Sequence, residues 1–126
     1  MPKKTIKTDR APAAIGPYSQ AVVSKGLLFT SGQLPIDPAT GKIPDGSIEE
    51  KAHMVFKNLQ AIAKEAGTHL DNAVKTTVYL ADIGNFQAVN KVYAQYFKEP
   101  YPARSAFQVA ALPLGADLEV EAIFQL

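Results

Sequence analysis

The segment that decides the fold is LEVEAIFQ, residues 118–125, which closes the 126-residue chain but for one residue. Its alternation predicts a β-strand, because successive side chains of a strand point to opposite faces of a sheet. Val120 and Phe124 then share one face, and Ile123 shares the other face with Glu119 and Glu121. The sequence therefore places apolar side chains on both faces of the sheet.

The elements outward from this strand follow the order strands, helix, strand, helix, strands. Ser47-Ile48-Glu49-Glu50 is a capping-box pattern, and the apolar spacing after it predicts a helix that Gly67 ends. A second helix is expected from about Asn85 to Phe97, where Pro100 prevents its continuation. The remaining strands are expected at Lys3–Thr8 (a short edge strand), Tyr18–Ser24, Leu27–Ser31, Ala73–Ala81 and Ser105–Ala110.

This order predicts an α+β domain that spans residues 1–126, with one mixed β-sheet and two helices packed on one face. Two helices cover only one face of such a sheet. An apolar face that stays uncovered predicts a homo-oligomer.

The composition excludes several classes of function. Lysine and arginine are scattered and the formal net charge is +1, which argues against a dedicated nucleic-acid surface. The chain has no cysteine, which removes thiol catalysis and zinc–thiolate sites. His53 and His69 are not spaced as metal ligands and no glycine-rich phosphate loop occurs, so neither a metal nor a cofactor is expected. No apolar run has the length of a membrane span and no signal segment is seen, so the cytoplasm is the default compartment.

Charged residues interrupt two expected strands, and we expect the functional site there. Pro102-Ala103-Arg104-Ser105-Ala106 places an arginine where a proline-rich loop enters an apolar strand. Its guanidinium is suited to bind a substrate carboxylate through two charge-assisted hydrogen bonds. Glu119 and Glu121 lie on one strand face, where one of them can act as a general acid or base. The alternatives are an internal salt bridge from Arg104 to either glutamate, or a polar seam between subunits.

Three other positions give weaker signals. Gly32, in Ser31-Gly32-Gln33, ends a strand and allows a ligand to approach the backbone closely, unless it is a plain strand-to-loop transition. Tyr18 follows a Gly-Pro turn and either packs over a ligand or covers the core. Asn90 lies beside the apolar stripe of the second helix, where asparagine is mildly unfavourable, which hints at a hydrogen-bonding role.

Taken together, these stretches resemble the RidA/YjgF family of reactive intermediate deaminases. The resemblance covers nearly the whole chain in family order. Its segments are residues 14–21 (AIGPYSQA), 29–35 (FTSGQLP), 74–80 (VKTTVYL), 89–93 (VNKVY), 101–105 (YPARS) and 118–122 (LEVEA).

The resemblance implies a chorismate-mutase-like fold and a homotrimer with ligand sites between adjacent subunits. It also implies hydrolysis of 2-imino acids and their enamine tautomers, such as 2-iminobutanoate and 2-iminopropanoate, to 2-keto acids and ammonia, without a cofactor. Such intermediates leak from pyridoxal-phosphate enzymes. In family terms Arg104 matches the carboxylate-binding arginine, and Glu119 matches the catalytic-site glutamate. Other pocket positions match Tyr18, Ser31, Gly32 and Asn90, and Ala106 stands where the family often has a cysteine, so that only a backbone contact survives there.

Two other functions remain open at this point. The first is a non-catalytic or chaperone-like trimer that binds keto acids or amino acids in the same arginine cleft, and turnover discriminates it from the deaminase. The second is an endoribonuclease or translation inhibitor, against which the near-neutral charge and the lack of a paired-histidine or metal site count.

Overall fold

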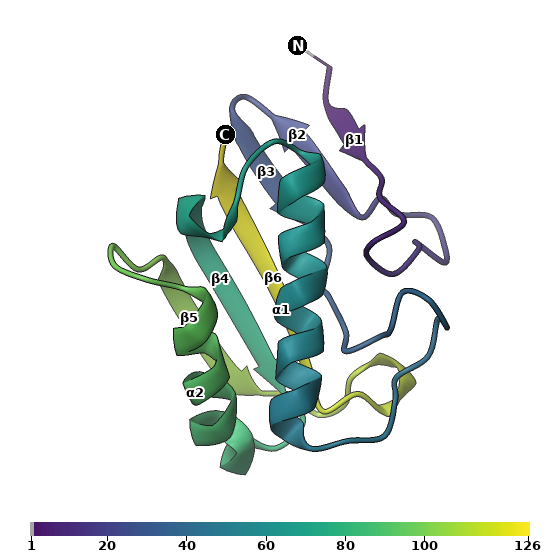
Figure 1. Cartoon of the computed structure of the whole chain (residues 1–126), viewed down its shortest axis with the longest axis vertical. Helices are drawn as coiled ribbons and strands as arrows, with labels where there is room; N and C mark the ends of the chain where they lie inside the picture. The colour runs from purple at the N-terminus through teal and green to yellow at the C-terminus, as the bar shows by residue number, and fades with distance from the viewer. Residues whose placement is uncertain (1) are drawn as a thin grey trace.

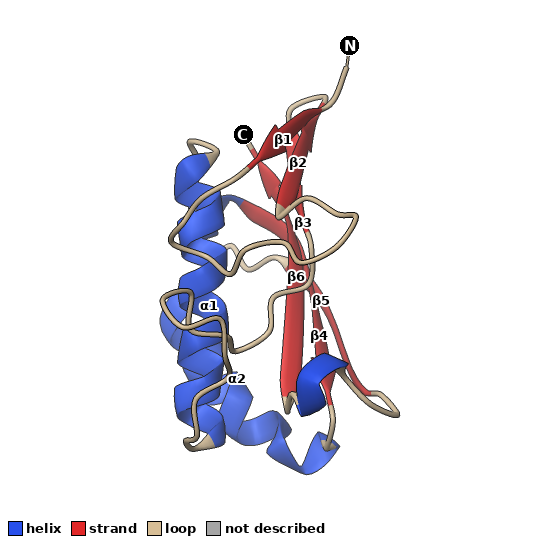
Figure 2. Cartoon of the chain, turned by 90° about the vertical axis from the view of Figure 1, so that its right-hand side faces the viewer, coloured by secondary structure: helices blue, strands red, loops and turns tan. Residues whose placement is uncertain are grey.

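The structure, a computed structural model that describes residues 2–126, is one mixed sheet with two helices on one face. The strands lie in the order β1-β2-β3-β6-β4-β5 (Figure 1). Helices α1 and α2 form a second layer, seen edge-on in Figure 2. The expected α+β architecture is confirmed. The elements are β1 (Lys4–Ile6), β2 (Ala21–Ser24), β3 (Leu27–Thr30), α1 (Ile48–Glu65), β4 (Ala73–Leu80), α2 (Phe86–Tyr96), β5 (Ala103–Gln108) and β6 (Leu118–Gln125), with single 3-10 turns η1 (Leu70–Asn72), η2 (Ile83–Asn85) and η3 (Pro113–Gly115).

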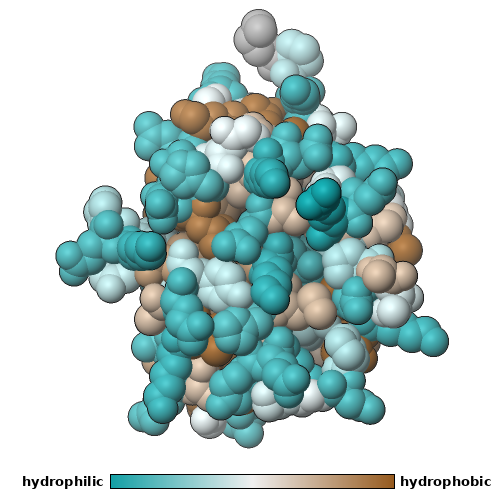
Figure 3. Space-filling view, viewed as in Figure 1, coloured by the Kyte–Doolittle hydropathy of each residue, from teal (hydrophilic) through white to brown (hydrophobic). Residues whose placement is uncertain are grey.

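Strand β6 lies inside the sheet, antiparallel to both β3 and β4. Leu118, Val120 and Phe124 are fully buried against the helices, whereas Glu119, Glu121 and Ile123 are half-buried on the other face. The alternation expected from the sequence is confirmed. The second face is uncovered in the single chain, because Phe29 and Phe107 on it are 41% and 43% exposed. The outer surface of the helix layer is mostly hydrophilic by contrast (Figure 3).

Helix α1 begins as the sequence predicts. Ser47 and Glu50 form a reciprocal capping box, in which each side chain accepts a hydrogen bond from the other residue's backbone N–H. The apolar face of the helix is fully buried on the sheet, through Val55, Phe56, Leu59 and Ile62 among others. Among residues 2–126, no helix combines the length and the apolar character needed to cross a bilayer.

Several boundaries differ from the expectation, and two of these differences bear on the site. Tyr18, Ser19 and Gln20 precede β2 instead of beginning it, because a turn closed by Tyr18 N–H on the Gly16 carbonyl at 2.9 Å takes them out of the ladder. Strand β5 begins at Ala103, two residues earlier than expected, because it pairs in parallel with β4 from Lys75 onward. Arg104 is therefore a strand residue and not a loop residue.

Candidate active site

Arg104 lies on the helix-covered side of the edge strand β5, where it faces α2. Its Nη1 donates a hydrogen bond to Asn90 Oδ1 at 2.7 Å. The guanidinium carbon lies 4.7 Å from the ring centroid of Tyr93 and 5.3 Å from that of Phe86. Two aromatic faces and one amide thus orient the cation, while the side chain as a whole stays exposed.

Arg104 has no carboxylate partner among residues 2–126, where the salt bridges are Lys51–Asp117 and His69–Asp71. Glu119 and Glu121 pair in register with Tyr79 and Thr77, on the face away from the helices. The internal salt bridge between Arg104 and either glutamate is therefore wrong, because the sheet separates the partners. The guanidinium of Arg104 therefore keeps N–H donors for an acceptor on another molecule.

Two surface hollows border Arg104. One, of about 410 Å³, is lined by Asn90, Tyr93, Ala94, Tyr101 and Pro102 together with the arginine. The other, of about 550 Å³, adds Ala106 and residues from η2 and the first turn of α2. The structure thus brings Arg104, Asn90 and Ala106 to one edge of the molecule.

Glu119 lies at the start of β6 in a separate pocket of about 320 Å³. Tyr18 and Gly32 line the same pocket, with a largely apolar remainder. Gly32 is needed there for space: a Cβ at this position would overlap the Glu119 carboxylate and lie 2.7 Å from its Cδ and 3.0 Å from its Cγ. The structure therefore gathers three of the predicted site residues, Tyr18, Gly32 and Glu119, around one cavity.

Ser31 serves this pocket indirectly. Its hydroxyl donates to the Ser19 carbonyl at 2.6 Å, and its N–H donates to the Gln20 carbonyl at 2.9 Å. These bonds fix the turn that carries Tyr18, whose Oη accepts from Ile15 N–H at 3.3 Å. In the single chain, Ser31 is thus a support for the Tyr18 wall and does not line the pocket.

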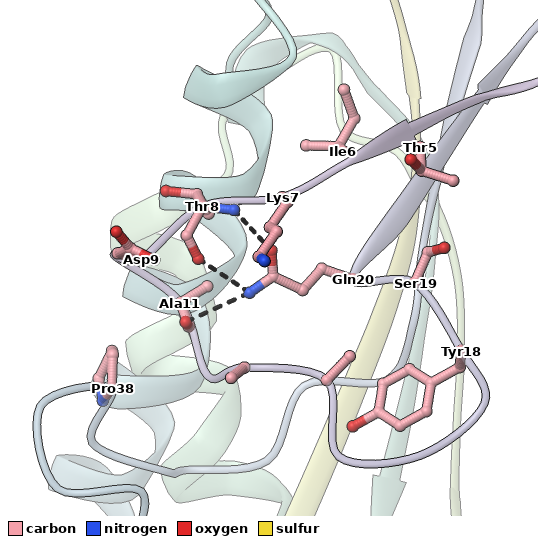
Figure 4. Close-up of a pocket in the computed structure, with 12 residues that line it drawn as sticks. Thr5, Ile6, Lys7, Thr8, Asp9, Ala11, Tyr18, Ser19, Gln20 and Pro38 are labelled. Carbon is pink, nitrogen blue, oxygen red and sulfur yellow. Dashed lines mark hydrogen bonds between the residues drawn. The ribbon is translucent and has the colours of Figure 1, made fainter.

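Gln20 ties this turn to the N-terminal segment, a contact that the sequence analysis missed. Its side chain is 4% exposed; its Oε1 accepts from Thr8 N–H at 2.7 Å, and its Nε2 donates to the carbonyls of Thr8, Ala11 and Pro12 at 2.8–3.3 Å. Figure 4 shows this amide between Thr8 and Ala11, above the pocket that Tyr18 also borders. Tyr18 is therefore a wall shared by two neighbouring cavities.

Glu119 and Glu121 differ in their surroundings. Glu121 Oε1 accepts a hydrogen bond from Tyr79 Oη at 3.1 Å. Burial, followed by the nearby charge of Glu121, raises the pKa of Glu119 above the ordinary value for a glutamate. A carboxyl group with a raised pKa can hold a proton nearer neutral pH, which suits a group that must both accept and donate one.

The raised pKa of Glu119 gives a prediction for stability. The native state binds more protons than the unfolded chain between the ordinary pKa and the raised one, so stability falls as the pH rises through that interval. Glu119→Gln, which resembles the neutral form, is expected to unfold at a higher temperature than the natural chain at about pH 7.5, and the difference should shrink near about pH 4. Because a neighbouring cation would lower this pKa, thermal unfolding is measured at a protein concentration low enough to keep the chain monomeric. A variant less stable than the natural chain at the higher pH would contradict the prediction.

Phe86 and Tyr93 belong to the apolar stripe of the second helix, beside which Asn90 was expected. They lie four residues before and three residues after Asn90, the spacings that share one helix face. This spacing indicates that two aromatic rings lie beside Asn90 on one helix face, where they can contact a cation that Asn90 binds. Burial raises the pKa of Tyr93, whose hydroxyl lies 2.9 Å from Thr76 Oγ1, so this ring is a neutral platform for the arginine.

Comparisons with known proteins bear on this arrangement. The family model described as Endoribonuclease L-PSP, which represents the RidA/YjgF proteins, matches residues 8–125. The chain belongs to the RidA/YjgF family. The human 2-iminobutanoate/2-iminopropanoate deaminase is 50% identical over 121 residues, which cover 96% of this chain and 88% of the human protein.

Solved structures of the RidA/YjgF family agree with the fold. A Rid-family protein of unknown function from Yersinia pestis superposes with a TM-score of 0.96 at 47% identity, covering 99% of this chain and 100% of that one. The structure of E. coli TdcF with bound serine gives a TM-score of 0.92 at 41% identity, covering 98% of both chains. The family membership expected from the sequence is confirmed.

Proposed function

We propose that this protein is a 2-iminobutanoate/2-iminopropanoate deaminase, which hydrolyses reactive 2-imino acids and their enamine tautomers to 2-keto acids and ammonia. The observation that carries the proposal is the setting of Arg104. Its guanidinium lies over the Tyr93 ring and is oriented by a bond to Asn90, and it has no carboxylate partner within residues 2–126. The human relative that bears this activity in its name supports the same substrate. We place the reaction in the cytoplasm.

The division of the site between the two faces of the sheet supports a homotrimer with sites between subunits. Arg104 faces α2 and Glu119 faces away from the helices, so one small substrate cannot touch both within a single chain. Arg104 of one copy must meet the Glu119 pocket of the next copy, in a head-to-tail contact that a closed ring satisfies. The uncovered apolar face around Phe29 and Phe107 provides the surface for such contacts.

Binding would begin with the substrate carboxylate. The free donors of the Arg104 fork hold it by charge-assisted hydrogen bonds, each of which contributes about 1.5–3 kcal/mol. Asn90 and the Tyr93 ring keep the guanidinium in one orientation, which limits the entropy lost on binding. The C=N carbon is thereby fixed next to a water molecule at the partner's pocket.

Glu119 would then carry the proton transfers. As the carboxylate it takes a proton from the attacking water, and a bond forms between that oxygen and the C=N carbon while the nitrogen gains a proton. The product is a carbinolamine. The proton that the nitrogen gains is the one that Glu119 took from water. In the collapse of the carbinolamine, Glu119 takes the hydroxyl proton as the C=O bond forms and gives it to the nitrogen as the C–N bond breaks, so a 2-keto acid and ammonia leave. Tyr18, Gly32, Ser31 and the backbone at Ala106 shape the site around these steps, and no cofactor takes part.

A non-catalytic role in binding keto acids or amino acids is the second candidate, and the serine bound to E. coli TdcF favours it. The name of the family model favours endoribonuclease activity as a third. The scattered charges and the net charge of +1 weigh against RNA as a substrate, because RNA binding depends on phosphate neutralisation.

The consumption of an imine tests the proposal. Threonine dehydratase or an amino-acid oxidase generates the imine while semicarbazide competes for it, and the semicarbazone is measured as this protein is added. We expect the natural chain to suppress the semicarbazone and Arg104→Ala not to. No suppression with several amino-acid precursors would overturn the deaminase and leave the binding role, and RNA cleavage that resists RNase-free repurification would favour the third candidate.

A further inference from the structure

The pocket of Glu119 has an apolar rim, and two of its residues, Ile15 and Leu114, have no part in the proposed reaction steps. Ile15 is 76% exposed, Leu114 65% and Tyr18 50%, and all three line this pocket. Leu34, Ile36 and Pro113 line the same cavity, and of these Ile36 is buried. Clustered exposed apolar side chains around a cavity are typical of a binding site and not of an ordinary soluble surface.

Leu114 is held in an unusual backbone conformation. It lies in η3 with φ 59° and ψ 21°, in the left-handed region that asparagine and glycine adopt more readily than leucine. Gly115 follows with φ 65°, so two consecutive residues with left-handed φ turn the chain three residues before β6 begins at Leu118. A leucine that is both strained and exposed gains nothing for the fold, and such residues cluster at ligand sites.

The chemistry of a 2-imino acid accounts for this rim. Carbon 2 carries a carboxylate, a C=N nitrogen and one side chain. In the proposed function, on which this step rests, the partner's Arg104 takes the carboxylate and Glu119 acts at the C=N bond. The side chain is therefore the one substituent of carbon 2 without an assigned contact, and the apolar rim around Ile15 and Leu114 is the part of the cavity wall without an assigned role.

We propose that Leu114, together with Ile15, forms the subsite for the side chain of the substrate and selects aliphatic 2-imino acids. The cavity of about 320 Å³ has room for side chains longer than ethyl. Each added methylene that the rim covers is expected to raise kcat/KM about three- to fourfold. A charged side chain gains nothing from this wall and loses its hydration there.

The test compares imines that an amino-acid oxidase makes from alanine and from norvaline, whose side chains differ by two methylenes, in competition with semicarbazide. Leu114→Asn removes the apolar side chain but tolerates the left-handed backbone, so the turn is kept. We expect the ratio of kcat/KM for the norvaline-derived imine over the alanine-derived imine to fall about tenfold.

The matched control is Leu126→Asn. Leu126 is also an exposed leucine, 47% exposed, and it lies seven residues along the chain from Glu119, roughly 23 Å at the rise of a strand. We expect its ratio to equal that of the natural chain. The molar mass of both variants in solution is also measured. If Leu114→Asn loses the oligomer and Leu126→Asn keeps it, a neighbouring copy covers the rim, and the subsite is overturned.

The outcomes separate this inference from the proposed function. Turnover of both imines with an unchanged ratio in Leu114→Asn overturns the subsite and leaves the deaminase standing. If the natural chain consumes no imine, the deaminase fails, and calorimetry with pyruvate, 2-oxobutanoate and 2-oxopentanoate then tests the rim alone. Affinity that does not rise with chain length, or a rise that Leu114→Asn does not reduce, overturns the subsite.

Discussion

Arg104→Lys is expected to lower kcat/KM for imine hydrolysis about 10- to 100-fold, although the positive charge is kept. Lysine carries one compact ammonium in place of the planar fork, so it cannot present two parallel donors to a carboxylate from the orientation that the Asn90 bond gives the guanidinium. Steady-state rates of semicarbazone suppression measure the loss. Near-normal turnover would contradict the bidentate grip.

The control for this substitution is Arg10→Lys. Arg10 is the other arginine of the chain and lies exposed in the N-terminal segment, outside the proposed site. The same chemical change at position 10 is expected to leave the rate unchanged. A similar loss in both variants would point to a general effect on the protein.

The proposed division of the site between copies predicts that two inactive variants restore activity when they are combined. When Arg104→Ala and Glu119→Gln chains are mixed, unfolded and refolded together, contacts that pair an intact Arg104 with an intact Glu119 form again. Random mixing in equal amounts gives about a quarter of the natural number of sites. Absence of activity in mixed oligomers, proven by mass, would mean that both residues act in one chain or that one of them does not act.

Gly32→Ala is expected to lower kcat about a hundredfold or more, because small displacements of a catalytic group have effects of that size. The added methyl overlaps the Glu119 carboxylate and forces that side chain to another rotamer, while the strand ends around it remain paired through Gln33 and Val120. The fold should persist, with unfolding temperature and circular dichroism close to those of the natural chain.

Two further variants decide whether Gly32→Ala acts through Glu119. If it does, Gly32→Ala combined with Glu119→Gln should be no slower than Glu119→Gln alone, since the two changes remove the same function. Gly46→Ala is the matched control, because a Cβ there would meet only the Glu50 side chain, at 3.3 Å from Oε1, 3.5 Å from Cδ and 3.6 Å from Cβ. A multiplicative loss in the double variant would assign Gly32 a role of its own.

The alternation of β6 and the capping box of α1 were predictable because each depends on local sequence alone. The face on which Arg104 lies was not. A strand shifted by one residue presents each side chain to the opposite face, so the position of Arg104 depends on how β5 pairs with β4. Without that register the face of Arg104 could not be assigned, so the internal salt bridge to Glu119 or Glu121 remained open.

The Glu119 pocket was predictable in part. Tyr18, Gly32 and Glu119 were each selected from the sequence, by the turn before Tyr18 or by a break in pattern, and the structure brings the three together. Ile15 and Leu114 were not selected, because an apolar residue in a loop gives no signal until its exposure is known. For the same reason, the contact of Arg104 with the Phe86 and Tyr93 rings could not be told from ordinary core packing in the sequence.

The placement of Arg104 and Glu119 on opposite faces of one sheet determines how activity depends on the concentration of this protein. If activity needs neighbouring copies, specific activity depends on protein concentration through mass action. Dilution below the dissociation constant of the assembly should silence folded, undamaged chains. A cell that halves the expression of such a protein near that threshold loses more than half of its capacity, and recovers it steeply when expression rises.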